Sequence, residues 1–499
     1  MILAHDIGTT GNKASLYSDA GDQVAATTVE YPTDFGPQGK AEQDAEQWWA
    51  AVTSATRALL EMSGEDAGSI ECVSFSGQMM GAVLLDDAGR PLRPAIIWAD
   101  TRAQTECDVL VERVGMERCY AITGHRLNPT YSLSKLMWVR NHEPEVWSQT
   151  RTVLLTKDYV AFRLTGRIAT DPSDASSTNA YDQNAGRWSE ELLGAAEVNV
   201  DLMPEVVPST TVLGGITEDA ASETGLRSGT PVVMGGGDGP CAALGAGITS
   251  PESGAYTYLG SSSWVSLAAD RPLLDPQMRT MTFDHVIPNR FVPTATMQAG
   301  GASMEWVADL LAPGRASDRY KRLVEAAADV EAADDGLIFL PYLLGERSPY
   351  WNPRARGSFI GLAKHHGPAH VTRAVMEGVA MNLRVGLLAF EEMGDRIDVV
   401  DAIGGGARSN VWLQIFADVW GKTVRRRSLV DEANSLGAAV VAGVGVGLFD
   451  DFEVVSQLSH VEKGFQPDPG RARRYATRYQ QFLDAYERLV PLFNELQGN

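Results

Sequence analysis

Residues 2–17, ILAHDIGTTGNKASLY, place a glycine turn between two short apolar runs, and this pattern decides how the rest of the chain is interpreted. The runs Ile2–Ala4 and Ala14–Tyr17 predict strands, joined by the turn Gly8-Thr9-Thr10-Gly11. Such a turn presents backbone N–H groups and two hydroxyls in one concavity, which suits phosphate oxygens. Because it joins two strands, it is neither a Walker A loop nor a dinucleotide fingerprint, both of which open helices. An ordinary β-hairpin turn is the alternative interpretation.

Two charged residues flank this turn. Asp6, at the end of the first strand, can hold Mg²⁺ directly or through water. Lys13 can add a positive point charge beside a bound phosphate. The segment therefore has the parts of a phosphate site with a metal-associated carboxylate.

The same pattern starts again past Pro204. Strands are predicted over Ala255–Leu259 and Trp264–Leu267, around the turn Gly260-Ser261-Ser262-Ser263. This indicates an internal duplication, with one strand–turn–strand unit in each half. Two such turns in two similar halves favour a nucleotide in a cleft between them, although a serine-rich surface turn is the alternative for the second one alone.

Strands and helices alternate through both halves. A helix is predicted over 44–62 with Asp44 as its N-cap, and others over 369–392 and 410–419. The strand Val399–Ile403 precedes the last of these, and a hairpin-like turn, Asp86–Gly89, separates two further strands. The last 30 residues have the pattern of an exposed amphipathic helix. The sequence thus predicts an α/β fold of two similar halves.

Composition excludes several classes of protein. The chain has 499 residues, 44% hydrophobic and 21% charged, which is typical of soluble globular proteins and of about two large domains. With 42 basic and 64 acidic residues the formal net charge is −22, which disfavours nucleic acid and anionic membrane surfaces as partners. Four cysteines lie without Cys-x-x-Cys spacing, and no signal peptide is evident, so we expect reduced thiols in the cytoplasm.

Two glycine-rich loops follow predicted strands. In Gly404-Gly405-Gly406, close to Asn410, only glycine lets backbone approach a base or ribose so closely. In the second loop, 235–239, Asp238 stands among four glycines and can accept a proton from a substrate hydroxyl. Loop packing is the alternative for the first, and an N-cap for a helix beginning near Cys241 is the alternative for Asp238.

Longer motifs make the chain resemble the FGGY family of carbohydrate kinases over essentially its whole length. Residues 357–362 and 370–377 (GSFIGL and HVTRAVME) fit the family's C-terminal signature, and residues 132–139 (SLSKLMWV) approximate the N-terminal one, with Thr130 a departure. The segment 340–349 (LPYLLGERSP) is also similar to the family. Within it the nearest likeness is to xylulokinases, through Gln43-Asp44, Ser76–Met79 and Leu154–Tyr159.

The resemblance implies roles for individual residues. It implies two ribonuclease-H-like domains of the actin and hexokinase type, 1–245 for the sugar and first phosphate loop and 246–499 for the nucleotide, with a C-terminal helical tail and a cleft between them. Asp238 matches the catalytic base and a metal-associated residue, and Asp6 matches the Mg²⁺-associated aspartate. The residues matching the nucleotide site are Thr9, Thr10, Lys13, Gly260, Ser261, Gly301, Gly405, Gly406 and Asn410. The residues falling on the sugar site are Gln78, Met79, Met80, Trp98, Asp100 and Asp238.

Two residues depart from the xylulokinase pattern. Met80 stands where these enzymes typically carry His, and Gly239 stands where they typically carry Asn. Both positions touch the sugar in the family, so they bear on which sugar is bound and leave the phosphotransfer residues intact.

We therefore expect an ATP- and Mg²⁺-dependent sugar kinase, a phosphotransferase with an alcohol acceptor, that converts D-xylulose to D-xylulose 5-phosphate. A kinase for ribulose, erythrulose, erythritol or another ketose or polyol is the first alternative. A non-catalytic sugar-binding regulator and an actin- or chaperone-like ATPase are the others. The expected partners are a small sugar and ATP, with no nucleic acid and no membrane, and a homodimer is left open.

Overall fold

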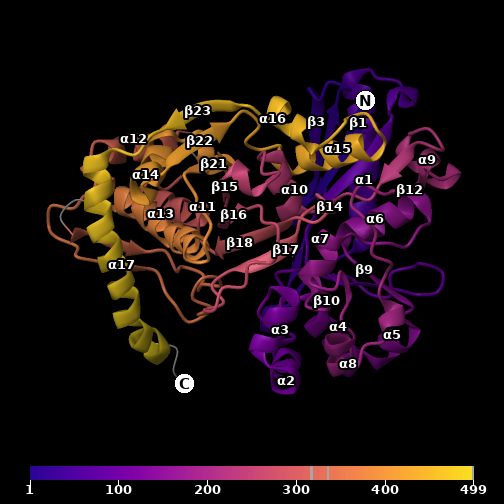
Figure 1. Cartoon of the computed structure of the whole chain (residues 1–499), viewed down its shortest axis with the longest axis horizontal. Coiled ribbons are helices and arrows are strands. Elements are labelled where there is room, and N and C mark those ends of the chain that lie inside the picture. Colours follow the sequence, from indigo (N-terminus) through magenta and orange to yellow (C-terminus); the bar gives the residue numbers. More distant parts are fainter. Residues whose placement is uncertain (315–317, 334–335, 497–499) are drawn as a thin grey trace.

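Two seven-stranded mixed sheets form the two halves of the molecule (Figure 1). The computed structural model describes residues 1–314, 318–333 and 336–496. The first sheet uses strands from residues 2–237 and the second uses strands from residues 255–465. The predicted α/β fold of two similar halves is confirmed.

The first sheet has its long antiparallel strands at one edge and parallel strands at its centre. β1 pairs antiparallel with β2 and parallel with β6, and β13 lies parallel on the far side of β6. The strand order is β12 (Val212–Gly215), β13 (Pro231–Val233), β6 (Cys72–Gly77), β1 (Ile2–Ile7), β2 (Gly11–Tyr17) and β3 (Gln23–Glu30), with β14 (Gly236–Gly237) also on β6.

The second sheet repeats this arrangement of directions. β15 pairs antiparallel with β16 and parallel with β21, which pairs parallel with β22. The order is β17 (Met281–Asp284), β18 (Phe291–Met297), β16 (Ser263–Leu267), β15 (Ala255–Leu259), β21 (Val399–Ile403), β22 (Thr423–Arg427) and β23 (Val461–Phe465). The internal duplication predicted from two turns is therefore a duplication of sheet topology.

Helices cover the faces of both sheets. α1 (Ala45–Ser63) packs on β2 and β3, and its N-cap is Asp44 as predicted, with the carboxylate accepting from the Glu46 N–H at 3.0 Å. On the second sheet α13 (Pro368–Glu392) lies against β16 and β18, and α14 (Asn410–Trp420) lies against β22. The amphipathic C-terminal helix is α17 (Pro469–Leu496), which packs on α14 at the outer edge of this half (Figure 1).

Further elements complete the two halves. The helices are α2 (Gln104–Val114), α3 (Met116–Thr123), α4 (Ser132–His142), α5 (Pro144–Gln149), α6 (Thr156–Thr165), α7 (Pro172–Ala175), α8 (Glu190–Ala196), α9 (Glu218–Thr224), α11 (Gly301–Leu311), α12 (Arg319–Ala328) and α16 (Val455–Leu458). Short strands are β4 (Asp34–Phe35), β5 (Ala41–Gln43), β7 (Val83–Leu85), β8 (Ala95–Ile96), β9 (Thr152–Leu154), β10 (Tyr181–Asp182), β11 (Arg187–Trp188), β19 (Ile338–Leu340) and β20 (Ser358–Ile360).

The hairpin-like turn expected at Asp86–Gly89 is present, and antiparallel bridges join its flanks at Ala82–Ile96 and Leu85–Pro91. The turn itself forms, with the Gly89 N–H donating to the Asp86 carbonyl at 3.1 Å. The longer ladders lie elsewhere, because β7 also pairs with β9 and β8 also pairs with β5. Both flanking strands are fully buried, so each finds a partner that is distant in sequence, which a local turn signal cannot reveal.

Two helices cross at the junction of the halves. α10 (Asp238–Gly245) follows β14 of the first sheet, and its Ala242 and Ala243 belong to an apolar cluster with Tyr256 and Ile403 of the second sheet. α15 (Ala433–Gly445) follows β22 of the second sheet, yet it packs on β1 and β6 of the first (Figure 1). The two helices cross so closely that a Cβ on Gly437 would lie 2.0 Å from the Cys241 carbonyl oxygen.

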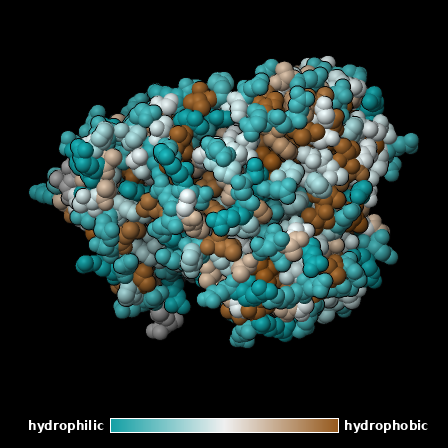
Figure 2. Space-filling model, in the orientation of Figure 1, coloured by the Kyte–Doolittle hydropathy of each residue, from teal (hydrophilic) through white to brown (hydrophobic). Residues whose placement is uncertain are grey.

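No helix in residues 1–314, 318–333 and 336–496 has both the length and the apolarity needed to cross a bilayer. Figure 2 shows apolar residues in small groups among hydrophilic ones on the face in view.

The helix crossing predicts a stability effect. Gly437→Ala should lower the free energy of unfolding by about 1–3 kcal/mol, because the added methyl group must push the α10 backbone away. Gly194→Ala is the matched control, since Gly194 lies inside α8 with no atom within 4 Å of the added Cβ, and it should gain roughly 0.5–1 kcal/mol. Urea unfolding measures both, and an unchanged or raised stability for Gly437→Ala would contradict the close crossing.

Candidate active site

A cavity of about 320 Å³ lies between the two sheets. Both halves of the chain contribute to its walls. Six of the residues predicted from the sequence line it: Asp6, Thr9, Met79, Met80, Trp98 and Asp238. Gly239, one of the two departures noted above, lines it as well.

Strand register brings the two aspartates to the same end of the first sheet. Asp6 lies beside Ser76 in the parallel pair of β1 and β6, and the Ser76 hydroxyl donates to the Asp6 carboxylate at 2.8 Å. β14 places Gly236 on the other side of Ser76, so the chain reaches Asp238 two residues later at that same edge. From the second half, the Asn434 amide donates to Asp6 at 3.4 Å.

Asp238 is the first residue of α10, whereas Gly237 is its N-cap, so the N-cap role considered for Asp238 is not the one observed. Asp238 is half-buried, and its carboxylate accepts the Gly239 N–H at 2.8 Å. Burial, together with the negative charge of Asp6, raises the pKa of Asp238 to about 7. Burial likewise raises the pKa of Asp6. A carboxylate in this range is suited to accept a proton near neutral pH.

The first turn is held against the cavity wall. The Trp98 indole N–H donates to the Thr9 hydroxyl at 2.8 Å, and the Gln43 amide donates to the Thr9 carbonyl at 2.6 Å. Thr10 is exposed and does not line the cavity. Lys13 reaches the second half, where its ammonium donates to the Asp431 carbonyl at 2.8 Å and pairs with Glu432 at 3.2 Å.

The loops assigned to the nucleotide converge at the end of β15. The Gly301 N–H donates to the Gly260 carbonyl at 2.7 Å, and the Ala302 N–H donates to the Ser261 carbonyl at 3.0 Å. A Cβ on Gly406 would lie 2.8 Å from the Leu259 side chain, so this loop also packs there. Gly405 lies in the same short helical turn, Gly405–Arg408. None of these residues lines the cavity itself. The next residues of the second turn, Ser262 and Ser263, do line it.

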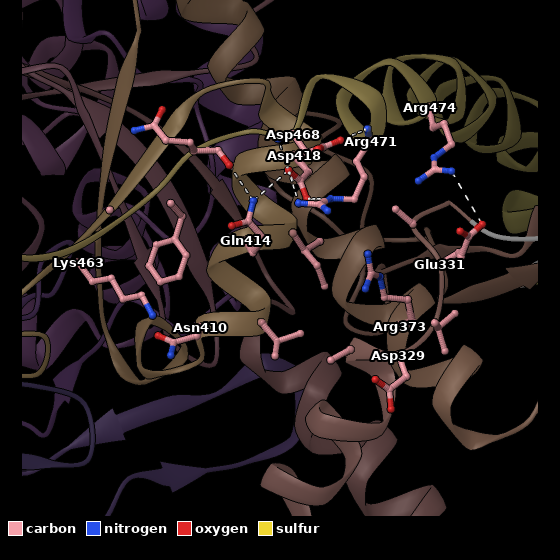
Figure 3. A pocket seen from close by; sticks show the side chains of 18 residues that line it. Asp329, Glu331, Arg373, Asn410, Gln414, Asp418, Lys463, Asp468, Arg471 and Arg474 are labelled. Carbon is pink, nitrogen blue, oxygen red and sulfur yellow. Dashed lines mark hydrogen bonds and ion pairs between the residues drawn. The ribbon is translucent and has the colours of Figure 1, made fainter.

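Asn410 lies at the edge of a second, larger hollow of about 830 Å³ (Figure 3). α14 forms one wall of it with Asn410, Gln414 and Asp418, and Arg471 of α17 pairs with Asp418 at 2.6 Å. None of the other predicted nucleotide residues lines this hollow.

Two predicted sugar residues lie behind the cavity wall instead of on it. Gln78 is buried and its amide donates to Gln43 at 2.8 Å, which in turn holds Thr9. The buried Asp100 carboxylate accepts the Ala41 N–H at 2.8 Å and pairs with Arg102. Both side chains are therefore engaged in supporting the first turn and its neighbour β5, and neither lines the cavity.

Several lining residues were not singled out from the sequence. Arg347 lines the cavity, and its Nε is buried without a hydrogen-bond partner among the described residues. The hydroxyl of Thr296, which also lines the cavity, is likewise buried without a hydrogen-bond partner among the described residues. Glu346 accepts the N–H groups of Gln298 and Arg347 at 2.9 and 3.0 Å, and burial raises the pKa of its carboxyl to about 8. Arg347 lies in the segment 340–349 that carried the family resemblance, so the sequence offered a reason to consider it as a site residue. Asn434 lies in no such motif.

The chain matches known proteins over its full length. The FGGY family of carbohydrate kinases has an N-terminal domain that matches residues 1–245 and a C-terminal domain that matches residues 255–446. The chain belongs to the FGGY family of carbohydrate kinases. It is similar to the xylulose kinase of Escherichia coli, with 35% identity over 493 residues, 99% of this chain and all of the relative.

The chain is also similar to a protein with another sugar in its name and to a solved structure. The gluconokinase of Bacillus subtilis is 31% identical over 491 residues, covering 97% of this chain and 95% of that protein. The crystal structure of xylulose kinase from Rhodospirillum rubrum superimposes with a TM-score of 0.91 at 33% identity, covering 99% of each chain. The fold and the kinase class implied by the resemblance are thus confirmed.

The raised pKa of Asp238 predicts how the kinase activity depends on pH. Only the ionised carboxylate accepts a proton, and its pKa is raised to about 7, so activity is lost as the pH falls through this value. The parameter kcat/KM should therefore fall about tenfold per pH unit on the acid side. Asp6→Asn removes the neighbouring charge and should move this limb to lower pH. A wild-type profile that stays flat to pH 5 would contradict the assignment.

Proposed function

We propose that the chain transfers the γ-phosphoryl group of ATP to D-xylulose, giving D-xylulose 5-phosphate. The observation that carries the chemistry is the half-buried Asp238 carboxylate, with a pKa of about 7, in a cavity that both halves line. The sugar is suggested by the names of the relatives from Escherichia coli and Rhodospirillum rubrum.

In the proposed reaction Asp238 accepts the proton of the sugar hydroxyl as that oxygen attacks the γ-phosphorus. Met79, Met80 and Trp98 provide an apolar wall that holds the sugar carbons. The Thr9 turn and the Ser262 turn face the cavity from opposite halves, and their hydroxyls and N–H groups are placed to bind phosphate oxygens. Lys13 adds positive charge at the edge of the site. Excluding water from the cavity would limit wasteful hydrolysis of ATP.

We infer that Asp6 and Asp238 hold Mg²⁺. Asp6 and Asp238 are half-buried carboxylates whose pKa values are raised by burial, so they are hard oxygen donors short of positive charge. Mg²⁺ typically binds one or two carboxylates together with substrate phosphates and waters, so this donor set fits it. When bound, the ion neutralises charge on the phosphates.

The division of labour follows the two halves. We propose that residues 1–245 supply the sugar wall, the base and the first phosphate turn, and that residues 246–499 supply the nucleotide loops at Gly260, Ser261, Gly301, Gly405, Gly406 and Asn410. The convergence of the first five at the end of β15 supports this assignment. Thr10 and Asn410 would then contact nucleotide beyond the 320 Å³ cavity, and Gln78 and Asp100 would act by supporting its wall.

A sugar acid is the second candidate substrate. Arg347 is a cation on the cavity wall with an unpartnered Nε, and a carboxylate would complement it. The relative from Bacillus subtilis is named a gluconokinase. A ketose oxygen can also accept from Arg347, and the substrate screen distinguishes the two sugars.

We also propose a cytoplasmic location. All four cysteines are buried and free, which suits a reducing compartment. ATP and the sugar are the proposed partners, without nucleic acid, and a homodimer stays a prediction.

A coupled ADP-release screen tests the function. D-xylulose should give the highest kcat/KM among ketopentoses, erythrulose, erythritol and aldonates. The KM for D-xylulose should be higher than is usual for a xylulose kinase, because Met80 and Gly239 line the cavity without strong polar side-chain groups. Arg347→Met should lower kcat/KM about tenfold, the typical loss for a charged hydrogen bond. Arg354→Met, at an exposed site in the same loop, is the control and should change little.

The screen separates the candidates. Gluconate turnover above that of D-xylulose, abolished by Arg347→Met, would replace the ketose with a sugar acid. The absence of ADP release with every sugar would favour a non-catalytic sugar-binding protein.

A further inference from the structure

A buried turn rich in hydroxyl groups lies behind the cavity. Residues 171–178, here called the support turn, comprise α7 and the 3₁₀ turn Ser176–Thr178. All of their side chains except that of Pro172 are fully buried. Polar groups are buried at a cost unless they are hydrogen-bonded, so the partners of these hydroxyls reveal what the turn supports.

Three serines of the support turn each accept a backbone N–H beside a different cavity wall. Ser173 accepts the Gly237 N–H at 2.9 Å, immediately before Asp238. Ser177 accepts the Met80 N–H at 3.1 Å. Ser176 accepts the N–H of Asp284 at 3.0 Å, next to Phe283, which lines the cavity. One turn therefore contacts the residue before the base, the backbone of the sugar wall and β17.

A buried ionic cluster holds the support turn. The Lys157 ammonium lies 2.9 Å from Asp171 and 3.0 Å from Asp174, both in the turn, and 2.5 Å from Asp158, with all four side chains inaccessible to solvent. Asp171 also accepts the Ser173 hydroxyl at 2.5 Å and the Ser209 hydroxyl at 2.8 Å. The Ser173 hydroxyl is thereby oriented so that its lone pairs face the Gly237 N–H.

The two segments that the turn supports need this restraint. A Cβ on Gly236 would lie 2.9 Å from the Ser173 hydroxyl and 2.3 Å from Val286, so the chain before Asp238 runs tightly against the turn. Met80 has a φ of 64°, a left-handed conformation that is unfavourable for a side-chain-bearing residue. Its N–H is fixed by Ser177, and its carbonyl accepts the Lys135 ammonium at 2.7 Å.

We propose that the support turn, anchored by Lys157, is a positioning device with two separable outputs: Ser173 sets the position of Asp238, and Ser177 sets the position of Met80. Neither serine touches substrate. The proposal rests on the proposed function, in which Asp238 is the base and Met80 borders the sugar. It also accounts for the segment Leu154–Tyr159, which carried the xylulokinase likeness but lines no part of the cavity.

The two serines should give opposite kinetic signatures. Ser173→Ala should lower kcat about tenfold or more with the sugar KM within about twofold, since a misplaced catalytic group costs rate. Ser177→Ala should raise the sugar KM about tenfold with kcat within about twofold. Ser189→Ala is the matched control, because Ser189 is a buried serine that accepts a backbone N–H at the start of α8, away from the cavity. It should change neither parameter. The sugar used is the one on which the wild type is most active.

Hydrogen exchange provides a readout that does not need turnover. Peptides covering 232–240 should exchange faster in Ser173→Ala only, and peptides covering 77–84 should exchange faster in Ser177→Ala only. Lys157→Met leaves three buried carboxyls without their cation and should not fold, so it is not used. Equal changes of kcat and KM in both variants, or faster exchange at both segments in each, would overturn the proposal. Lack of D-xylulose turnover by the wild type would contradict the proposed function alone.

Discussion

The contact between α10 and α15 is the constraint on which the rest of the structure depends. α15 leaves the second sheet and packs on the first, whereas α10 has apolar residues in clusters with both halves. The two helices meet where Gly437 faces the Cys241 carbonyl and Gly245 faces the Ala433 carbonyl. Both helices start at the cavity, α10 with Asp238 and α15 just before Asn434. Their crossing therefore delivers one functional residue from each half to a single site.

The two carboxylates at the cavity destabilise the free protein and at the same time suit the proposed reaction. Asp6 and Asp238 line one cavity, and burial raises the pKa of both. Such an arrangement is unfavourable in the free protein and is typical of functional sites. The Lys13 ammonium donates to the Asp431 carbonyl and pairs with Glu432, so the residue that suits a phosphate also links β2 to the segment just before α15.

Patterns within a few adjacent residues correctly predicted the features of the fold that depend only on those residues. The strand–turn–strand unit of residues 2–17, the α1 cap at Asp44 and the position of Asp238 after a buried strand all follow from a few adjacent residues. Pairing between distant strands did not follow, because β7 and β8 each join a strand far away in sequence. The roles of Gln78 and Asp100 also depend on distant partners, Gln43 and Ala41, which no spacing rule identifies. Asn434 reaches the site only because α15 crosses to the first sheet.

The central claim is that Asp238 accepts a proton while other groups hold the nucleotide. The most direct measurement is turnover and ATP-analogue affinity for Asp238→Asn at saturating Mg²⁺. Asparagine keeps the size of the side chain but cannot act as a base, so kcat should fall about 10²–10⁴-fold with the nucleotide affinity changed little. An equal loss of nucleotide binding and turnover, or turnover near that of the wild type, would contradict the account.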